Sequence, residues 1–301
     1  MSYLRNPAAQ KAARGTPLGN SLRASLLYWR RHPGSAFLRL LTKLSIAITL
    51  LMLADLVADI LIKGIPNLRA SLFDPQFTTD NQSLLPSLVN TFAVTALALL
   101  VAIPLGVGGA IYLSEYAHRD SLLVRAVRLT AETLAGIPSI LYGLFGMMFF
   151  VISLRLGLSI LSGALTLSLM VLPLILRTTE VALLSVPDGY REGSYGLGAG
   201  KLRTVWRIVL PPAAPGILAG VVLAIGRIVG ETAALLFTAG TVAAMPSGLL
   251  SSGRTLSVHM YVLSGEGLHI GEAYATAAVL LAFVMVMNGL SSLISRRIIK
   301  E

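Results

Sequence analysis

The residues most able to do chemistry in this sequence are charged side chains that lie inside apolar runs. Arg227 lies within a long apolar stretch, and Glu231 follows four residues later. A charge inside a membrane span costs at least about 2.5–3.5 kcal/mol, so a retained charge normally has a function. On one helix the Glu231 carboxylate would orient the Arg227 guanidinium and offset part of its charge. The pattern predicts an anion site, with a structural intramembrane ion pair as the alternative.

A second group repeats this combination of a basic residue and a carboxylate. It consists of Arg177, Thr178, Thr179 and Glu180, at the inner end of another apolar run. Guanidinium groups bind phosphate oxygens in a bidentate way, and hydroxyl groups such as that of Thr232 are further donors. We therefore expect Arg177 and Arg227, on neighbouring helices, to suit a small tetrahedral dianion. The alternative for Arg177 is a basic anchor at the cytoplasmic membrane surface.

The composition indicates that membrane-spanning helices position these residues. Of the 301 residues, 55% are hydrophobic and 13% are charged, whereas about 25% of a soluble domain is charged. The chain has no cysteine, which excludes disulfides and thiolate metal sites, and its four histidines show no ligand spacing. A net charge of +10 could suggest nucleic acid. The basic residues, however, are separated by long apolar runs and are not gathered on one soluble face.

Runs of about 20 apolar residues, the length that crosses a hydrocarbon core, predict about six transmembrane helices. The expected spans are 40–62, 88–113, 137–156, 158–176, 217–237 and 274–294. Only Gly157 and its neighbours separate the third and fourth spans, so we expect a tight helical hairpin there, with one long bent helix as the alternative. The first span carries Asp55 and Asp59 on one face. To these two residues the pattern assigns no chemistry.

The basic residues also predict the orientation. The first 54 residues contain eight lysines and arginines and no acidic residue, which places the N-terminus in the cytoplasm. A cleaved signal peptide is the alternative, but the basic region is too long and no cleavage site follows the apolar run. An even number of spans returns the basic C-terminus to the cytoplasm. Loops 66–86 and 241–272 then lie outside, and loops 118–136 and 178–214 lie in the cytoplasm.

The second of these cytoplasmic loops contains a spaced motif between residues 187 and 211. Its positions are Glu192, Gly193, Ser194, then Gly198 after three residues, and Ile208, Val209, Leu210 and Pro211 after nine more. Small residues followed by Gly198 allow a short helix to turn sharply and approach a partner closely. Pro211 is expected to end that helix before the next span. An ordinary amphipathic loop carrying positive-inside charges is the alternative.

This spacing resembles the EAA loop of ABC importer permeases, although Gly193 and Ser194 stand where that family prefers alanine. The resemblance implies an all-α integral membrane protein with the MetI-like fold of type I importers. It also implies that the loop docks into a cytoplasmic ATPase subunit, with Glu192 orienting it through charge pairing. The loop residues that it assigns to coupling are Glu192, Gly193, Ser194, Gly198, Ile208, Leu210 and Pro211.

The residues from 226 to 240, the group 177–180 and the pair Asn90-Thr91 resemble the PstA type of phosphate-specific permease subunit. That resemblance covers roughly residues 84–295. It implies alternating-access import of inorganic phosphate across a bacterial inner membrane. The residues that it assigns to the path are Arg227, Glu231, Arg177, Glu180, Thr178, Thr179 and Thr232. The implied partners are a second permease of PstC type, two ATPase subunits of PstB type that bind ATP and Mg²⁺, and an external phosphate-binding protein of PstS type.

Four segments follow from this sequence. They are a basic cytoplasmic tail at 1–39, a first helix and external loop at 40–83, the permease domain at 84–295, and a basic tail at 296–301. The stretch before Lys201 is not a Walker motif, because Tyr195 replaces the first glycine and Leu202 replaces the hydroxyl residue. ATP hydrolysis is therefore expected of another chain, and this chain is not expected to be an enzyme.

Three other functions remain as alternatives. The nearest is a permease for another oxyanion, such as sulfate or molybdate. A membrane enzyme acting on lipid phosphates would need a nucleophile, a base or a metal cluster, and the sequence shows no such constellation. A structural subunit without a substrate path is disfavoured by the charge of Arg227 inside its apolar run.

Overall fold

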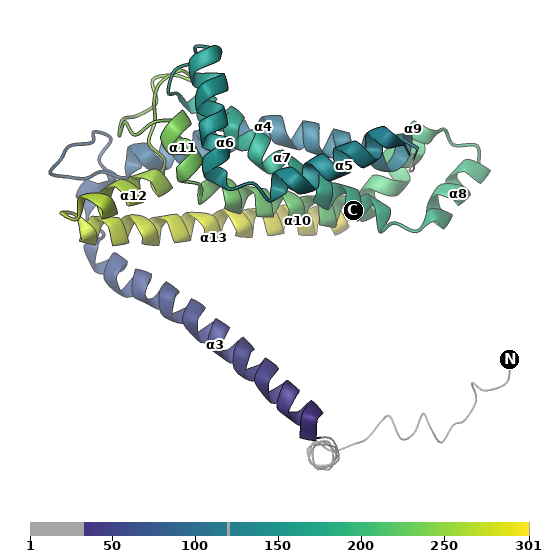
Figure 1. Ribbon diagram of the computed structural model, residues 1–301, viewed down its shortest axis with the longest axis horizontal. Helices are drawn as coiled ribbons and strands as arrows, with labels where there is room; N and C mark the ends of the chain where they lie inside the picture. The colour runs from purple at the N-terminus through teal and green to yellow at the C-terminus, as the bar shows by residue number, and fades with distance from the viewer. Residues whose placement is uncertain (1–32, 119–120, 301) are drawn as a thin grey trace. The chain divides into compact units, whose positions relative to one another are not determined.

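The computed structural model describes residues 33–118 and 121–300, which are helical apart from their connections, with no strand among them (Figure 1). The chain forms two units, Met1–Asp59 and Ile60–Glu301. Helix α3 (Pro33–Gly64), most of which belongs to the first unit, begins with a proline, which suits a first helical turn. It contains the expected first span. Residues 1–32 of the expected basic tail lie outside the described residues.

The second unit is built on four long apolar helices that lie side by side in Figure 1. They are α4 (Leu85–Ile111), α7 (Ile160–Leu184), α10 (Leu210–Val229) and α13 (Ile270–Lys300). Helix α4 packs along α7, α7 along α10, and α10 along α13. Small residues permit this close packing, because a Cβ atom on Gly106 of α4 would lie 2.8 Å from Ile175 of α7. Alanine and aliphatic side chains from α4, α7 and α10 form the main core.

The third span is a bent pair of helices. Helix α5 (Leu122–Ala135) and the continuous stretch of α6 (Ser139–Gly146) with the π-helix η4 (Met147–Ser153) meet at 104°. The bend lies at Gly136 and Pro138, since proline cannot continue a helix that precedes it. The prediction of a loop at 118–136 was therefore wrong, because most of it is α5. With the bent pair counted as one span, six candidate spans are present among the described residues.

The helix breaks between the third and fourth spans, since η4 ends at Ser153 and α7 begins at Ile160, and this break excludes the single long bent helix. Arg155 and Gly157, in the connection, both have positive φ, 57° and 66°. Gly157 adopts this conformation without the steric cost of a side chain. The fourth span, however, continues beyond the predicted end at residue 176 to Leu184, so Arg177–Glu180 lie inside α7 and not at its terminus.

The loop 178–214 is also more helical than predicted. It contains α8 (Asp188–Gly196), α9 (Lys201–Thr204) and the π-helix η5 (Val205–Val209), and the last two run into α10 as one apolar segment, Lys201–Val229. The prediction that Pro211 ends the helix was wrong. Pro211 stands in the first turn of α10, where a missing backbone N–H is tolerated.

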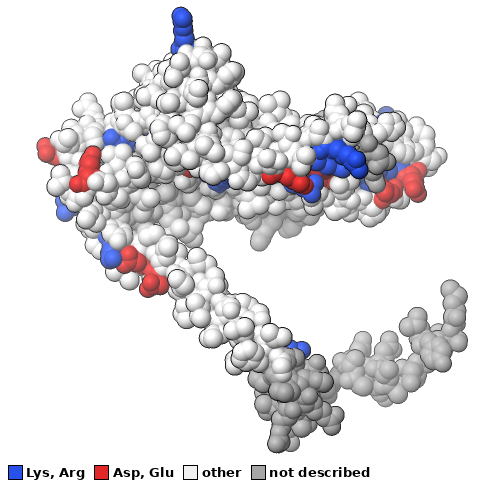
Figure 2. Space-filling view, in the orientation of Figure 1, with Lys and Arg blue, Asp and Glu red and all other residues white. Residues whose placement is uncertain are grey.

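The predicted fifth span is interrupted. Helix α10 ends at Val229, and after three residues the short helix α11 (Ala233–Thr238) begins. The loops between α3 and α4 and between α11 and α13 contain η1 (Ile65–Asn67), η2 (Ala70–Phe73) and α12 (Leu256–Glu266). We call the end of the second unit near α8 and α9 the α8 end, and the end near α11 and α12 the α12 end. Figure 2 shows a largely uncharged surface with blue and red side chains gathered over α5 and α8.

Candidate functional site

An ion network at the α8 end holds α5 against α7. The Glu180 side chain is fully buried and accepts a hydrogen bond from Arg128 Nε at 2.6 Å and another from Arg177 Nη1 at 3.2 Å. Arg177 also lies 3.6 Å from a Glu132 oxygen, and both of these side chains are about half exposed. Two guanidinium groups therefore share one buried carboxylate. Its single negative charge balances only one of their two positive charges.

Sequence reasoning missed Arg128 and Glu132, because it placed them in a loop. Arg125, Arg128 and Glu132 recur at helical spacing between apolar residues, and that periodicity was the available signal for an amphipathic helix. No local pattern, however, indicates that Arg128 meets Glu180, which lies 52 residues away in the chain.

The threonines predicted as anion donors differ in their surroundings. The Thr178 hydroxyl donates to the Leu174 carbonyl of its own helix at 2.8 Å, so its proton is already used. The Thr179 hydroxyl is buried and has no hydrogen-bond partner among the described residues. Thr232 is half-buried and lies in the break between α10 and α11. Of the three, Thr179 is the buried side chain whose donor is unused among the described residues.

Arg227 is half-buried in the last turn of α10, and no salt bridge joins it to a carboxylate among the described residues. It interacts electrostatically with the hydroxyl of Tyr142 on α6. The predicted ion pair with Glu231 is wrong, because α10 ends at Val229 and the two residues do not share a helix. A residue beyond a helix end no longer follows the i, i+4 geometry that brings such side chains together.

Glu231 instead stabilises the break between the two helices. Its carboxylate accepts a hydrogen bond from the Ala234 backbone N–H at 3.1 Å, and its carbonyl accepts one from the Ser257 hydroxyl at 2.6 Å. Only 8% of the residue is exposed. Glu231 therefore joins the start of α11 to α12.

Arg177 and Arg227 lie at different levels of the bundle. Gly220 of α10 packs directly on Thr178 of α7, so these two residues share a level. Arg227 follows Gly220 by seven residues, a helical rise of about 10 Å. The two guanidinium groups therefore start from backbone positions about two turns apart along the bundle.

The segment 187–211 exposes several large apolar side chains. Leu197 is 91% exposed, Leu202 65% and Trp206 63%. A groove of about 410 Å³ runs beside Tyr190, Leu197 and Ile208. Exposed apolar patches of this kind usually mark sites of contact with another molecule.

The polar residues of this segment shape the turn between α8 and α9. Gly198 has a φ of 82°, which glycine adopts without strain, and the Ser194 and Thr204 hydroxyls lie 2.8 Å apart. Glu192 is exposed, and no salt bridge to it exists within the described part of the chain. Its expected charge pairing is therefore not made within those residues.

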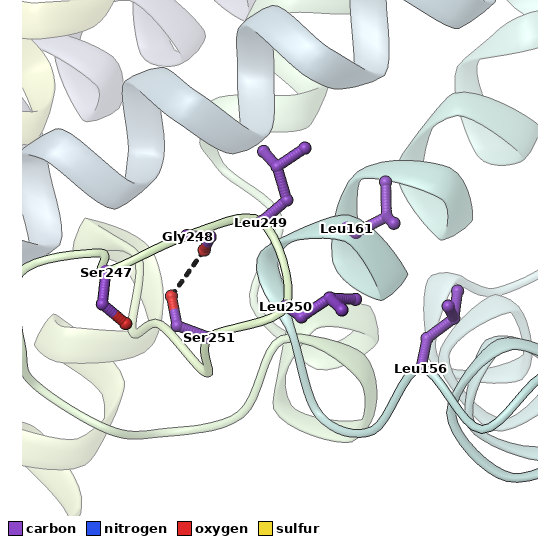
Figure 3. A pocket seen from close by; sticks show the side chains of 7 residues that line it. All are labelled: Leu156, Leu161, Ser247, Gly248, Leu249, Leu250 and Ser251. Atoms are coloured by element: carbon purple, nitrogen blue, oxygen red, sulfur yellow. Dashed lines mark hydrogen bonds between the residues drawn. The ribbon is translucent and has the colours of Figure 1, made fainter.

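A larger surface pocket, of about 770 Å³, lies at the α12 end between the start of α7 and the loop before α12 (Figure 3). Its lining consists of leucines, serines and one glycine. It contains no charged side chain, and Leu161 in its wall precedes Glu180 by 19 residues of α7, or about 28 Å. This pocket is unsuited to a dianion. In the described residues no cluster of histidine and carboxylate side chains suits a metal ion.

Comparison with known proteins adds independent information. The model of the family described as binding-protein-dependent transport system inner membrane component matches residues 102–300. A probable ABC transporter permease protein, YqgI of Bacillus subtilis, is 35% identical over 80% of this chain and 88% of its own length. The phosphate transport system permease protein PstA of Haemophilus influenzae is 33% identical over 87% of this chain and 93% of its own length.

Among solved structures, a bacterial alginate ABC transporter in complex with a pentasaccharide-bound periplasmic protein has a chain of similar fold. The two chains superimpose with a TM-score of 0.65 at 17% sequence identity, over 90% of this chain and 98% of the other. At this identity the likeness concerns the fold alone. It confirms the predicted all-α architecture of an ABC importer permease.

Proposed function

Since this chain belongs to the family of binding-protein-dependent transport system inner membrane components, we propose that it is the permease subunit that carries inorganic phosphate in an ATP-driven importer. The PstA protein of Haemophilus influenzae, which aligns over 87% of this chain, supports phosphate as the substrate. Transport proceeds by alternating access, in which the path opens to one side of the membrane at a time.

The observation that supports this proposal is that the Arg227 side chain is half-buried in an apolar helix and has no carboxylate partner among the described residues. An unneutralised charge in a membrane span is costly, and a bound anion offsets that cost. The planar guanidinium also offers two parallel donors to a tetrahedral oxyanion. Arg227 is therefore the first residue of the path to which we assign phosphate binding.

Arg177 provides a second phosphate-binding position, about two helical turns from Arg227 along the bundle. Its side chain is half exposed and shares the Glu180 carboxylate with Arg128, so an arriving dianion meets a guanidinium that is already oriented. Thr179, two residues later, adds a hydroxyl without a partner among the described residues, and we assign Thr178 and Thr232 to the same route, one at each level. The buried Glu180 keeps the local charge low enough for phosphate to leave.

The segment 187–211, which we call the coupling loop, is the surface we assign to the ATPase subunits of PstB type, which bind ATP and Mg²⁺. Its exposed Leu197, Leu202 and Trp206 supply the apolar contact. The unpaired Glu192 is then available to a basic group of that partner. Gly198 allows the sharp turn that presents the helix, and the motif residues Gly193, Ser194, Ile208, Leu210 and Pro211 shape its two sides.

The remaining partners and the orientation belong to the same proposal. A second permease of PstC type completes the path, and an external binding protein of PstS type delivers phosphate. The α8 end faces the cytoplasm, so both termini are cytoplasmic, in agreement with the acid-free basic N-terminal segment. Impermeant labelling of single cysteines is practical in this cysteine-free chain, and labelling of either terminus from outside would contradict this orientation.

Uptake of radiolabelled phosphate by cells that carry Arg227 variants tests the proposed function. Arg227→Lys keeps the charge but loses the fork, and Arg227→Gln loses both. Removing a charged hydrogen bond costs about 1.5–3 kcal/mol, so the Gln variant should lose roughly 10- to 150-fold in uptake and the Lys variant less. Arg125→Gln, an exposed arginine on α5, is the matched control and should transport normally.

Two outcomes contradict the proposal in different ways. Normal phosphate uptake by a stably inserted Arg227→Gln protein would make Arg227 a structural residue. Uptake that excess sulfate or molybdate suppresses more strongly than excess unlabelled phosphate would assign the path to another oxyanion.

A further inference from the structure

Arg191 of α8 fastens the coupling loop to the end of α4. The π-helix η3 (Tyr112–Tyr116) continues α4 directly and carries Glu115. Arg191 Nη2 lies 2.6 Å from Glu115 Oε1, and Arg191 Nε lies 3.2 Å from each carboxylate oxygen. Only 12% of the Arg191 side chain and 4% of the Glu115 side chain are exposed.

The same guanidinium fixes the end of α7. It donates to the carbonyls of Leu183 at 2.9 Å and Val186 at 2.8 Å, and it lies 3.2 Å from an Asp188 oxygen. Three pieces of chain, η3, the end of α7 and the start of α8, thus meet on one planar side chain. A lysine has a single ammonium group and cannot reproduce this fork.

A second contact reaches the same π-helix from the other side of the loop. Lys201, the first residue of α9, places its ammonium 5.0 Å from the centre of the Tyr116 ring, a distance typical of a cation–π interaction. Residues 191 and 201 bracket the exposed turn of the coupling loop. Arg191 and Lys201 both contact η3. A movement of the turn between them therefore acts on the end of α4 through two contacts.

Helix α4 carries this attachment to the α12 end. Asn90 donates to the carbonyls of Ala244 and Arg254, at 3.2 and 3.3 Å, and Thr91 accepts a hydrogen bond from the Leu256 N–H at 2.9 Å. The 25 residues from Asn90 to Glu115 span about 37 Å of helix. One helix therefore contacts the coupling loop at one end and the loop before α12 at the other.

We infer that Arg191 and Glu115 are positioning residues of the transport cycle, which transmit movement of the coupling loop to α4 and through it to the α12 end. This inference rests on the proposed function. Burial makes an ion pair expensive, and such pairs often add little net stability, so orientation is the better explanation for this one. The π-helical turn that carries Glu115 is wider than an α-helical turn, a form frequent at functional sites.

The experiment compares Arg191→Gln, Glu115→Gln and Arg191→Lys with the exchanged pair Arg191→Glu with Glu115→Arg, all in the full importer. Three quantities are measured: copurification of the ATPase, ATP hydrolysis, and phosphate transported per ATP hydrolysed in proteoliposomes. Arg125→Gln, which removes an exposed arginine of α5, is the control.

We expect the single variants to keep the ATPase bound while transport per ATP falls between about 2- and 30-fold, the usual range for residues that couple two sites. The exchanged pair restores an ion pair but places a carboxylate against the Leu183 and Val186 carbonyls and Asp188, so it should recover less of the ratio than Arg191→Lys keeps. A merely structural role would lower the amount of protein and leave the ratio unchanged.

Normal transport per ATP in the single variants would overturn the inference. If the Gln variants fail to insert, Arg191→Lys is the deciding variant, because it keeps the charge. A normal ratio of phosphate transported to ATP hydrolysed in that variant also overturns the inference. A wrong phosphate assignment is distinguishable, because the unmodified importer would then transport no phosphate.

Discussion

The two ends of the second unit are held together by different chemistry. At the α8 end, charged side chains from separate helices bind one another, as in the Arg128–Glu180 and Arg191–Glu115 pairs. At the α12 end, neutral side chains such as Asn90 bind backbone carbonyls. Ion pairs can exchange partners with an arriving anion or a docking protein, whereas side chains bound to backbone groups hold loops in one place. The α8 end is thus suited to a change of ion-pair partners, and the α12 end is suited to keeping its loops in one position.

The largest expected effect that would test this contrast comes from Glu180→Gln. The change removes the carboxylate that accepts from both Arg128 and Arg177, whose side chains are 29% and 49% exposed, and each hydrogen bond to a charged group contributes about 1.5–3 kcal/mol. Thermal and chemical unfolding of the chain in detergent measure the free energy of unfolding. Glu132→Gln is the control, because its side chain is 59% exposed and surface pairs contribute less than about 1 kcal/mol. Equal effects of the two changes would remove the distinction between the buried and the exposed pair.

A somewhat smaller effect is expected from pH at the α12 end. Burial, followed by the nearby charge of Arg254, lowers the pKa of His259 from 6.5 to about 4. The unfolded chain therefore takes up a proton before the folded one as the pH falls. The contribution of neutral His259 to the free energy of unfolding is complete above pH 6.5. It falls by about 2 kcal/mol at pH 5 and by roughly 3 kcal/mol at pH 4.

Thermal unfolding of the wild-type chain and of His259→Asn between pH 7.5 and pH 4.5 measures this difference. The variant should lose this part of the pH dependence, while His269→Asn, at a partly exposed histidine, should keep it. A wild-type profile that does not change between pH 7 and pH 5 would show that the α12 end does not hold this histidine neutral.

The smallest expected effect is that of Thr91→Val. Valine keeps the shape of threonine but removes the acceptor of the Leu256 N–H, and a buried unpaired donor costs about 1–3 kcal/mol. Hydrogen exchange at Leu256 should accelerate while the α8 end is unchanged. Thr133→Val, whose hydroxyl serves only its own exposed helical turn on α5, is the control. Unchanged exchange at Leu256 would show that α4 does not hold this loop.

The sequence predicted those features that are local. Arg227 was recognisable because a charge within an apolar run is visible without any partner, and the turn at Gly157 followed from the short gap between two spans. The break after α10 was missed although Gly230 marks it, because the apolar run continues beyond it. The pairing of Arg128 with Glu180 was not predictable, since it depends on how α5 folds back onto α7.

The exposed leucines and tryptophan of the coupling loop have a consequence for the biogenesis of the protein. Leu197, Leu202 and Trp206 are exposed in this chain, and the proposed ATPase partner would cover them. A copy synthesised without that partner displays them to the chaperones and proteases that triage exposed apolar segments. The proposal therefore predicts that the supply of the partner limits the abundance of this subunit in the cell, and that a copy without the partner is short-lived.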